Sequence, residues 1–559
     1  MPGPGEPAEI RSGPGGTAST ATANGATGST LTEKAPATSH PPQPATKSES
    51  TGSTLASARS FVMHGLDAHP VEIEVVFAGG LPQFQLVGLP SAAVRESRDR
   101  VRAALASTGI ELPPGRITVN LAPAHLRKDA TWLDLPIALA LLAALGRLPP
   151  GALPGLPAVG ELGLDGTLRP LRGALAVALA CRRLGGSPLL LPAASAAEAA
   201  CVPGIEAWGA RDLREVLHHL EGSEPLAPTP APDPGDGGGA AQTHDGGDLA
   251  EVRGQHAARR GLEIAAAGFH NLLMIGPPGC GKTMLARRLP AILPPLDPEE
   301  RLEASAIHAL AGLLDGGLLH QRPLRAPHHT ASAAALIGGG NPVQPGEVTL
   351  ARHGVLFLDE LPEFPRDALE ALRQPLEEGY VVIARCGDRL RLPAAGLVVA
   401  AMNPCPCGLH GDPQRCCTCP PGGPGRYRKR ISGPWLDRMD LQVAVHRPGA
   451  RALTDPATAE SSAEVAVRVA RAFARQRARN PGAVANSRLT AAQLRVVATL
   501  APALEQRLVD AGERLLLSAR ALVRVQRVAR TIADLAGNPA IETEHLDEAL
   551  SLRLDGTSG

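Results

Sequence analysis

A glycine-rich segment from Gly276 to Thr283 carries residue types that hold phosphate groups. It reads GPPGCGKT and matches the pattern GxxxxGK[ST]. Glycines there let backbone N–H groups curl around a β-phosphate, the lysine reaches the β- and γ-phosphates, and the hydroxyl residue holds Mg²⁺. The predicted nucleotide-binding residues are Gly276, Pro277, Pro278, Gly279, Cys280, Gly281, Lys282 and Thr283. The segment therefore predicts a site for a nucleoside triphosphate with Mg²⁺.

Two carboxylates end a second apolar segment, VLFLDE, and an amide ends a third, LVVAAMN. We expect Asp359 to coordinate Mg²⁺ together with Thr283, and Glu360 to activate the attacking water, because phosphoryl transfer depends mainly on positioning and charge neutralisation. Asn403 would orient the same water. The alternative is an acidic strand end that only caps the next helix.

Five of the nine cysteines fall between Cys405 and Cys419. Cys405 with Cys407, and Cys417 with Cys419, form two CxC pairs, and Cys416 lies beside the second pair. In a reducing compartment such clustering favours a metal over disulfides. Four thiolates can enclose tetrahedral Zn²⁺, so the pairs predict a zinc site. A reduced loop without metal is the alternative.

These side chains need a framework that brings distant segments together. The strands LLMIG, VLFLDE and LVVAAMN alternate with helical stretches, which predicts a parallel sheet covered by helices. The helical stretch MLARRLPAIL follows Thr283 at once. The amino terminus of that helix would add its partial positive charge to the phosphate site.

Composition divides the chain into five segments. Residues 1–56 contain almost no large apolar side chains, which predicts a disordered tail. Residues 57–221 alternate strands and helices as an α/β domain, and the Pro/Gly/Asp-rich residues 222–249 are expected to be a linker. Residues 250–448 hold the three strands above, and residues 449–559 read as a helical domain.

The expected elements of the N-terminal α/β domain come from its apolar patterns. Strands are expected at 71–77 and 116–123, and helices at 91–109 and 133–146. A strand-turn-strand follows at 159–171. A helix and a strand through SPLLLP are expected to complete the domain.

The overall composition fits a globular protein of several domains. The chain has 559 residues, of which 44% are hydrophobic, and its formal net charge is zero. No global field therefore draws it to nucleic acid or anionic lipid, and any such binding depends on local patches. The apolar runs are too short to span a bilayer and the first residues lack a signal pattern, so a cytoplasmic location is expected.

Longer motifs resemble a known family. RAPHHTASAAALIGGG, GVLFLDELPEF, LRQPLEEG, AAMNPCPCG, RISGPWLDRMDLQV and VARTIADLAG are similar to the magnesium-chelatase-like AAA+ ATPases of the YifB/ComM type, over about residues 57–550. The resemblance implies a homo-hexameric ATPase that uses ATP and Mg²⁺. It also implies a Lon-protease-like (S5-like) N-terminal α/β domain, an AAA+ P-loop module and a C-terminal helical lid.

The same resemblance implies two alternative activities. ComM-type members are ATP-dependent DNA helicases that promote branch migration during natural transformation. Other members are known as chelatase-like ATPases, which implies a magnesium-chelatase-type ATPase that remodels a protein partner. Stimulation of the ATPase by DNA distinguishes the two.

Roles for three further residues come from this resemblance. Asn403 would be sensor 1, Arg438 of LDRMD the arginine finger, and Arg520 of SAR sensor 2. An arginine finger acts on the γ-phosphate of a neighbouring subunit. Arg438 could instead form a surface ion pair with Asp437 or Asp440, and Arg520 could be an ordinary arginine on a helix face.

Two segments are candidates for contacting DNA. VVIARCGDRLRL reads as a hairpin that carries Arg385, Arg389 and Arg391 and precedes the Asn403 strand. The second is RPLRAPHHTASAAALIGGG, whose glycines and paired His328 and His329 suggest a mobile loop. Phosphate contacts supply most non-specific affinity for DNA, so arginines on such segments fit that role. A solvated charged face is the alternative for both segments, and His328 and His329 could instead bind a metal.

The Lon-like fold raises the question of proteolysis, which needs a Ser–Lys pair. The resemblance places Trp132 near the nucleophile position and Leu175 near the lysine position, and neither side chain can do that chemistry. The domain is therefore expected to be catalytically inactive. Lys128 is expected to lie at the surface or in an ion pair.

Overall fold

The computed structural model describes eight stretches of the chain: residues 55–232, 247–314, 317–340, 343–385, 388–394, 396–412, 415–449 and 459–554. The predicted tail (1–56), apart from its last two residues, lies outside them. The middle of the predicted linker, 233–246, also lies outside the described residues.

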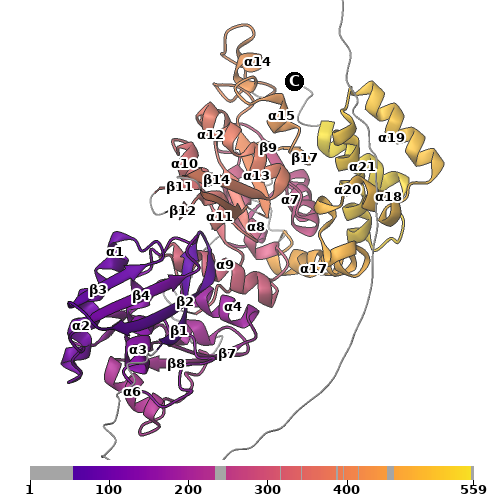
Figure 1. Cartoon of the computed structure of the whole chain (residues 1–559). Coiled ribbons are helices and arrows are strands. Elements are labelled where there is room, and N and C mark those ends of the chain that lie inside the picture. The colour runs from indigo at the N-terminus through magenta and orange to yellow at the C-terminus, as the bar shows by residue number, and fades with distance from the viewer. Residues whose placement is uncertain are drawn as a thin grey trace, which may run out of the picture. The chain divides into compact units, whose positions relative to one another are not determined.

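A four-stranded sheet forms the first part of the N-terminal region (Figure 1). Strand β1 (Leu55–His64) pairs antiparallel with β2 (Asp67–Ala78), which pairs antiparallel with β4 (Arg116–Ala122). Strand β3 (Gln83–Val87) runs parallel to β4. Buried and more exposed residues alternate along β2 from Val71 onward, so one face of this sheet faces a core.

Helices and short strands complete the region up to Glu221. They are α1 (Ala92–Arg95), α2 (Ser97–Ser107), α3 (Asp134–Ala144), β5 (Glu161–Leu162), β6 (Leu168–Arg169), α4 (Ala174–Arg183), β7 (Ser187–Pro192), α5 (Ala193–Ala200), β8 (Ile205–Ala210) and α6 (Leu213–Glu221). Helix α3 packs on β1 and β2.

Three details of this region differ from the sequence expectations. The helix expected at 91–109 is broken at Glu96, and SPLLLP does not complete the domain, because β8 and α6 follow and β8 pairs parallel with β7. The expectation of a surface position for Lys128 is wrong: the side chain is buried and its Nζ donates to the carbonyl oxygen of Pro123. Burial lowers the pKa of Lys128.

A five-stranded parallel sheet lies at the centre of residues 249–445. In order across the sheet, the strands are β10 (Leu324–Arg325), β13 (Val355–Leu358), β16 (Leu397–Met402), β9 (Leu272–Ile275) and β17 (Leu441–Ala444). This confirms the predicted parallel sheet. Residues that follow the carboxyl ends of β9, β13 and β16 therefore meet at one edge, where such sheets bind ligands.

The parallel sheet is buried on both faces, which explains why its strands are continuous apolar runs. Along β13, Val355 and Phe357 belong to the core on one face. Leu356 and Leu358 belong to the core on the other face. The strands are thus fixed from both sides, and their carboxyl ends are held in place.

Helices and two hairpins complete this region. They are α7 (His256–Gly268), α8 (Lys282–Ile292), α9 (Pro298–Leu310), α10 (Ala333–Ile337), β11 (Gly338–Gly339), β12 (Gln344–Pro345), α11 (Glu347–Leu350), α12 (Arg366–Ala371), α13 (Arg373–Glu378), β14 (Tyr380–Arg385), β15 (Asp388–Pro393), α14 (Gly423–Arg428) and α15 (Gly433–Leu436). The predicted hairpin is β14–β15. The segment expected to be a mobile loop contains α10 and part of the β11–β12 hairpin.

The regular elements described from 459 to 554 are all helical. The α-helices are α17 (Ser462–Arg479), α18 (Ala491–Val497), α19 (Pro502–Arg514), α20 (Ala519–Ala536) and α21 (Thr543–Leu554). Helix α17 begins with a capping box between Ser461 and Glu464, and its buried residues recur at helical spacing. Among the described residues, no helix is both long and apolar enough to cross a bilayer.

Candidate functional site

The GPPGCGKT segment leaves the carboxyl end of β9 and leads into α8. Gly276 lies where no side chain fits, because a Cβ there would come within 2.1 Å of the carbonyl oxygen of Val445. Gly281 has φ +96° and directly precedes α8, a backbone conformation that favours glycine. The two glycines therefore shape a tight loop that leads directly into the amino end of α8, where the first backbone N–H groups have no partner within the helix.

Lys282 holds this loop together. Its Nζ donates to the carbonyl oxygens of Gly276 (2.7 Å) and Pro277 (2.9 Å) and to Oδ1 of Asn403 (3.1 Å). The side chain is 8% exposed, and burial lowers the pKa of its amine. These three oxygen partners are neutral, so they do not cancel the charge of the ammonium group. The arrangement suits an anionic ligand such as a phosphate.

Thr283 and Asp359, the predicted Mg²⁺ ligands, lie next to each other. The Thr283 hydroxyl donates to Oδ2 of Asp359 at 2.6 Å, and the backbone N–H of Glu360 donates to Oδ1 of Asp359 at 2.9 Å. Hydroxyl and carboxylate oxygens are hard donors of the kind that Mg²⁺ prefers. The residues present therefore fit a magnesium ion beside bound phosphates.

Glu360 adopts a left-handed backbone conformation with φ +53°, which is uncommon for a residue other than glycine. It precedes a short 3₁₀ helix, Leu361–Glu363, and its side chain forms no cap hydrogen bond with that helix. The capping alternative therefore does not describe Glu360. Instead, Oε2 of Glu360 lies 3.3 Å from Nδ1 of His329, whose ring packs against that of His328.

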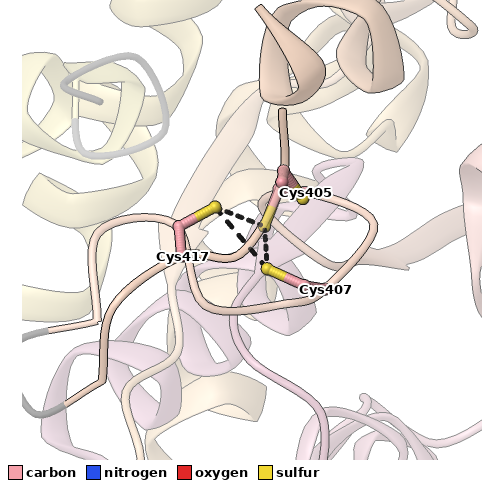
Figure 2. A group of neighbouring side chains, drawn as sticks. Cys405, Cys407 and Cys417 are labelled. Carbon is pink, nitrogen blue, oxygen red and sulfur yellow. Dashed lines mark hydrogen bonds between the residues drawn. The ribbon is translucent and has the colours of Figure 1, made fainter. Parts of the chain in front are cut away.

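The four predicted zinc ligands form a compact cluster. The sulfur atoms of Cys405, Cys407, Cys417 and Cys419 all lie within 4.8 Å of one another. Figure 2 shows three of them, with separations of 3.3 Å (Cys405–Cys407), 3.8 Å (Cys405–Cys417) and 3.5 Å (Cys407–Cys417). Tetrahedral Zn–S bonds of about 2.3 Å require S···S separations of about 3.8 Å. The donor set therefore fits Zn²⁺, and Cys416 is exposed outside it.

Backbone N–H groups face this cluster. The N–H of His410 donates to Sγ of Cys405 at 3.3 Å. Hydrogen bonds, first from the backbone N–H of Leu409 and then from Thr418 and Cys405, lower the pKa of the Cys407 thiol to about 5, whereas burial and the neighbouring thiols raise the pKa values of Cys417 and Cys419. Donors of this kind stabilise a thiolate, which is the form that binds metal.

Arg438 and Arg520 do not lie with the residues above. Arg438 comes three residues before β17, and its carbonyl oxygen accepts a hydrogen bond from the side chain of Asn271, which comes just before β9. Arg438 is therefore at the amino-end edge of the sheet. The four residues of β9 span about 13 Å between that edge and the GPPGCGKT loop.

Glu377 joins the two arginines. Its Oε2 pairs with Arg438, and its Oε1 lies 3.5 Å from Nη1 of Arg520. Arg438 therefore does form an ion pair, as the alternative expected, but its partner is Glu377 and not Asp437 or Asp440. The Arg438 side chain is largely buried and that of Arg520 is largely exposed.

Arg391 of the hairpin lines a cavity together with His353, which comes two residues before β13 and so lies at the end of the sheet opposite the GPPGCGKT loop. Arg389 and Arg391 are exposed and separated by one residue along β15, so they share one face of the hairpin. The Arg391 guanidinium lies 3.6 Å from the ring centre of Tyr380. The side chain of Arg385 lies outside the described part of the structure.

Three contacts could not be found from the sequence motifs. Gln255 donates to the carbonyl oxygens of Cys280 (3.0 Å) and His446 (2.6 Å) and so holds the GPPGCGKT loop from outside the motif. Glu377 and His329 contact predicted site residues across long sequence separations. No sequence pattern around Glu377 or His329 indicates which distant residue each of them contacts.

Three parts of the chain match known families. Residues 248–453 match the family described as "Magnesium chelatase, subunit ChlI". Residues 73–195 match "Subunit ChlI of Mg-chelatase", and residues 459–553 match "Magnesium chelatase, subunit ChlI C-terminal". The described loop, sheet and cysteine cluster all lie within the first of these matches.

Several proteins are similar to the chain over most of its length. A protein of Mycobacterium tuberculosis is 44% identical over 512 residues, which cover 90% of this chain and 99% of the relative. YifB of Escherichia coli is 43% identical, with 88% and 95% covered. The competence protein ComM of Haemophilus influenzae is 42% identical, with 89% and 97% covered. The chain therefore belongs to the YifB/ComM family of magnesium-chelatase-like AAA+ ATPases.

Proposed function

We propose that the chain hydrolyses ATP and couples the reaction to movement on DNA, as a helicase or branch-migration factor of the ComM type. One observation carries the ATPase part: Lys282 contacts Asn403, and Thr283 contacts Asp359, at a single edge of the parallel sheet. The DNA part is supported by the similarity to ComM along 97% of that relative's length.

The roles of the residues follow from this geometry. Mg²⁺, held by Thr283 and Asp359, would offset the negative charge of the phosphates. Lys282 would exchange its carbonyl partners for the β- and γ-phosphates, because charged acceptors bind an ammonium group more strongly than neutral ones. Glu360 would accept the proton of the attacking water, and Asn403 would orient that water.

Arg438 and Arg520 would act on the nucleotide of a neighbouring subunit. Both lie at the sheet edge opposite the GPPGCGKT loop, so neither can reach the phosphates in its own subunit. A cavity of about 530 Å³ at that edge is lined, among others, by two carboxylates, Glu377 and Asp440, and by four arginines: Arg488, Arg520, Arg524 and Arg527. The excess of arginines there suits a neighbour's phosphates, and composite sites of this kind require a ring, which we propose to be a homo-hexamer.

The β14–β15 hairpin is the proposed DNA contact, through Arg385, Arg389 and Arg391. Two of these, Arg389 and Arg391, are exposed on one face, where they can neutralise successive phosphates. The segment 322–340 is the second candidate. Because His329 contacts Glu360, DNA bound to that segment would act directly on the catalytic carboxylate.

The remaining regions would support this motor. We propose a Lon-like, catalytically inactive domain at 57–221, the ATPase domain at 250–448 and a C-terminal helical lid within 449–559. The cysteine cluster would hold Zn²⁺ as a structural ion, for which the sulfur separations are the support.

The second candidate function is a chelatase-type ATPase that remodels a protein partner. It is favoured by the family matches, all of which are described as magnesium chelatase subunit ChlI. Both functions use the same ATPase site. They differ in whether DNA accelerates hydrolysis.

The test is the steady-state ATPase activity of the full chain with and without single-stranded or forked DNA. We expect hydrolysis that DNA stimulates, and no hydrolysis above background in Lys282→Ala. Absence of ATPase activity in the wild type, or normal activity in Lys282→Ala, would refute the site. ATPase activity with no DNA binding at low salt would favour the protein remodeller.

A further inference from the structure

The segment from Pro404 to Gly422, which carries the four cysteines and is here called the cysteine loop, contacts the GPPGCGKT loop through Gly408. Gly408 follows Cys407 and has φ +76°. A Cβ on Gly408 would lie 2.3 Å from Cδ and 3.1 Å from Cγ of Pro278, the third residue of GPPGCGKT. The backbone of the cysteine loop is thus in contact with the Pro278 ring, and no side chain could be placed between them.

The cysteine loop has almost no core of its own. Of the described residues from Pro404 to Gly422, only Cys405 and Gly408 are buried. A turn hydrogen bond of 2.9 Å from the Gly408 N–H to the Cys405 carbonyl ties these two together. A segment with so little apolar burial cannot fix its position by packing, whereas four metal–thiolate bonds can.

The same loop begins beside a second residue of the nucleotide site. Asn403, which contacts Lys282, is separated from Cys405 by Pro404 alone. Elsewhere, the GPPGCGKT loop is held by Arg447, which donates to the Pro278 carbonyl at 3.3 Å, and by Gln255. The cysteine cluster is therefore linked to two residues of the nucleotide site: to Pro278 through the contact with Gly408, and to Asn403 through the chain.

We propose that Zn²⁺ in the four-cysteine cluster braces the phosphate-binding loop through the Gly408–Pro278 contact, so that metal binding raises the affinity for ATP. This inference rests on the proposed function, because it requires the GPPGCGKT loop to bind nucleotide. Coupling between two binding sites is reciprocal, so ATP must also tighten the hold on zinc by the same factor.

A pair of glycine variants tests the contact. Gly408 and Gly411 have nearly the same backbone conformation, with φ +76° and +77°, but a Cβ on Gly411 would meet nothing within 4 Å. Gly408→Ala and Gly411→Ala therefore carry similar backbone strain, and only the first disturbs Pro278. We expect Gly408→Ala to bind a fluorescent ATP analogue about tenfold more weakly than Gly411→Ala. Equal affinities of the two variants would overturn the proposal.

Zinc itself supplies the second measurement. Elemental analysis should find one zinc per chain in the wild type and loss of zinc in Cys405→Ser and Cys417→Ser, with weakened ATP-analogue binding in both. Release of zinc from the wild type to a chromogenic chelator should slow when a non-hydrolysable ATP analogue is bound. Zinc-free chain that binds the analogue as tightly as loaded chain, or zinc release unaffected by the analogue, would refute the coupling.

Lys282→Ala separates this inference from the function on which it rests. The variant should keep its zinc and lose nucleotide binding. If it binds nucleotide normally, the proposed function fails. If Lys282→Ala loses nucleotide binding but Gly408→Ala and Gly411→Ala bind the analogue with equal affinity, the proposed function stands and only the coupling through Gly408 and Pro278 is refuted.

Discussion

The Thr283 hydroxyl donates a 2.6 Å hydrogen bond to Asp359, although 76 residues separate them in the sequence. The two residues follow β9 and β13, which are not neighbours in the sheet, because β16 lies between them. Asn403 follows β16 and contacts Lys282 at 3.1 Å. The strand order therefore gathers three separate motifs into one site, with Asn403 on the strand between the other two.

Glu360→Gln should bind ATP normally and turn it over at least about 100-fold more slowly, because only the carboxylate that we propose as the proton acceptor is lost. Nucleotide binding and single-turnover hydrolysis measure the two effects separately. Glu363→Gln is the matched control, since Glu363 lies three residues further on and pairs with Arg430 instead. Hydrolysis at the wild-type rate in Glu360→Gln would mean that Glu360 has another role.

Arg438→Ala should lower turnover by about 10³-fold while leaving nucleotide affinity nearly unchanged, because its guanidinium is proposed to serve a neighbouring subunit. Mixing it with Lys282→Ala tests this directly. Mixed rings contain interfaces with one intact Arg438 and one intact Lys282, so ATPase activity should partly recover. Failure to recover, with co-assembly demonstrated by pull-down of differently tagged chains, would count against composite sites.

The elements that carry local signals could be predicted from the sequence. The apolar strands that end at Ile275, Leu358 and Met402 are buried on both faces of a parallel sheet, and such strands are continuous apolar runs. The GPPGCGKT spacing fixes the loop between strand and helix. The side chains that follow these strands could therefore be assigned from the sequence alone to the carboxyl-end edge of the sheet.

Contacts between distant segments could not be predicted in this way. Glu377 pairs with Arg438 across 61 residues, and neighbouring carboxylates at 437 and 440 offered closer partners in the sequence. Lys128 appeared to be a surface residue, but it is buried beside the Pro123 carbonyl. Such pairings depend on how elements pack in three dimensions, which no periodicity or spacing encodes.

Replacing Arg389 and Arg391 with alanine should weaken DNA binding and leave basal ATP hydrolysis intact, because the hairpin lies outside the Lys282 site. Each lost phosphate contact reduces the slope of log affinity against log salt by about 0.7 to 0.9, so the double variant should flatten it by about 1.4 to 1.8. Fluorescence anisotropy over a salt series measures the slope. Adding Arg385→Ala should flatten it further.

The charge-matched control for the hairpin is the double variant Arg471→Ala, Arg495→Ala. These arginines are exposed on α17 and α18, so the same charge is lost elsewhere. The control should retain the wild-type slope and DNA-stimulated hydrolysis. An unchanged slope in the hairpin variant would move the DNA contact to the segment from Arg325 to Gly340 or to the N-terminal domain.

The last prediction concerns His353, a largely buried histidine that comes two residues before β13. His353 lies between two carboxylates of α9, with Nε2 2.5 Å from Oε2 of Glu303 and Nδ1 3.4 Å from Oε1 of Glu300. Burial alone would lower the pKa of His353, but its hydrogen bonds to Glu300 and Glu303 outweigh this effect and raise that pKa. Burial likewise opposes ionisation of Glu300, yet His353 and Arg322 lower the pKa of Glu300 to about 2.

These shifts give the stabilisation a defined pH window. Because the pKa of His353 is raised in the folded protein, protonated His353 stabilises the fold fully below the usual histidine pKa of 6.5. This stabilisation is lost as the pH rises through the raised pKa. Glu300 has a lowered pKa, so its carboxylate stabilises the fold above the usual pKa of 4.5, and this stabilisation is lost as the pH falls towards 2.

His353→Ala should therefore lower the melting temperature more at about pH 5.5 than at about pH 9. His256→Ala, at an exposed position on α7, is the control and should show no such difference. An equal loss of melting temperature at both pH values in His353→Ala would show that His353 contributes packing alone.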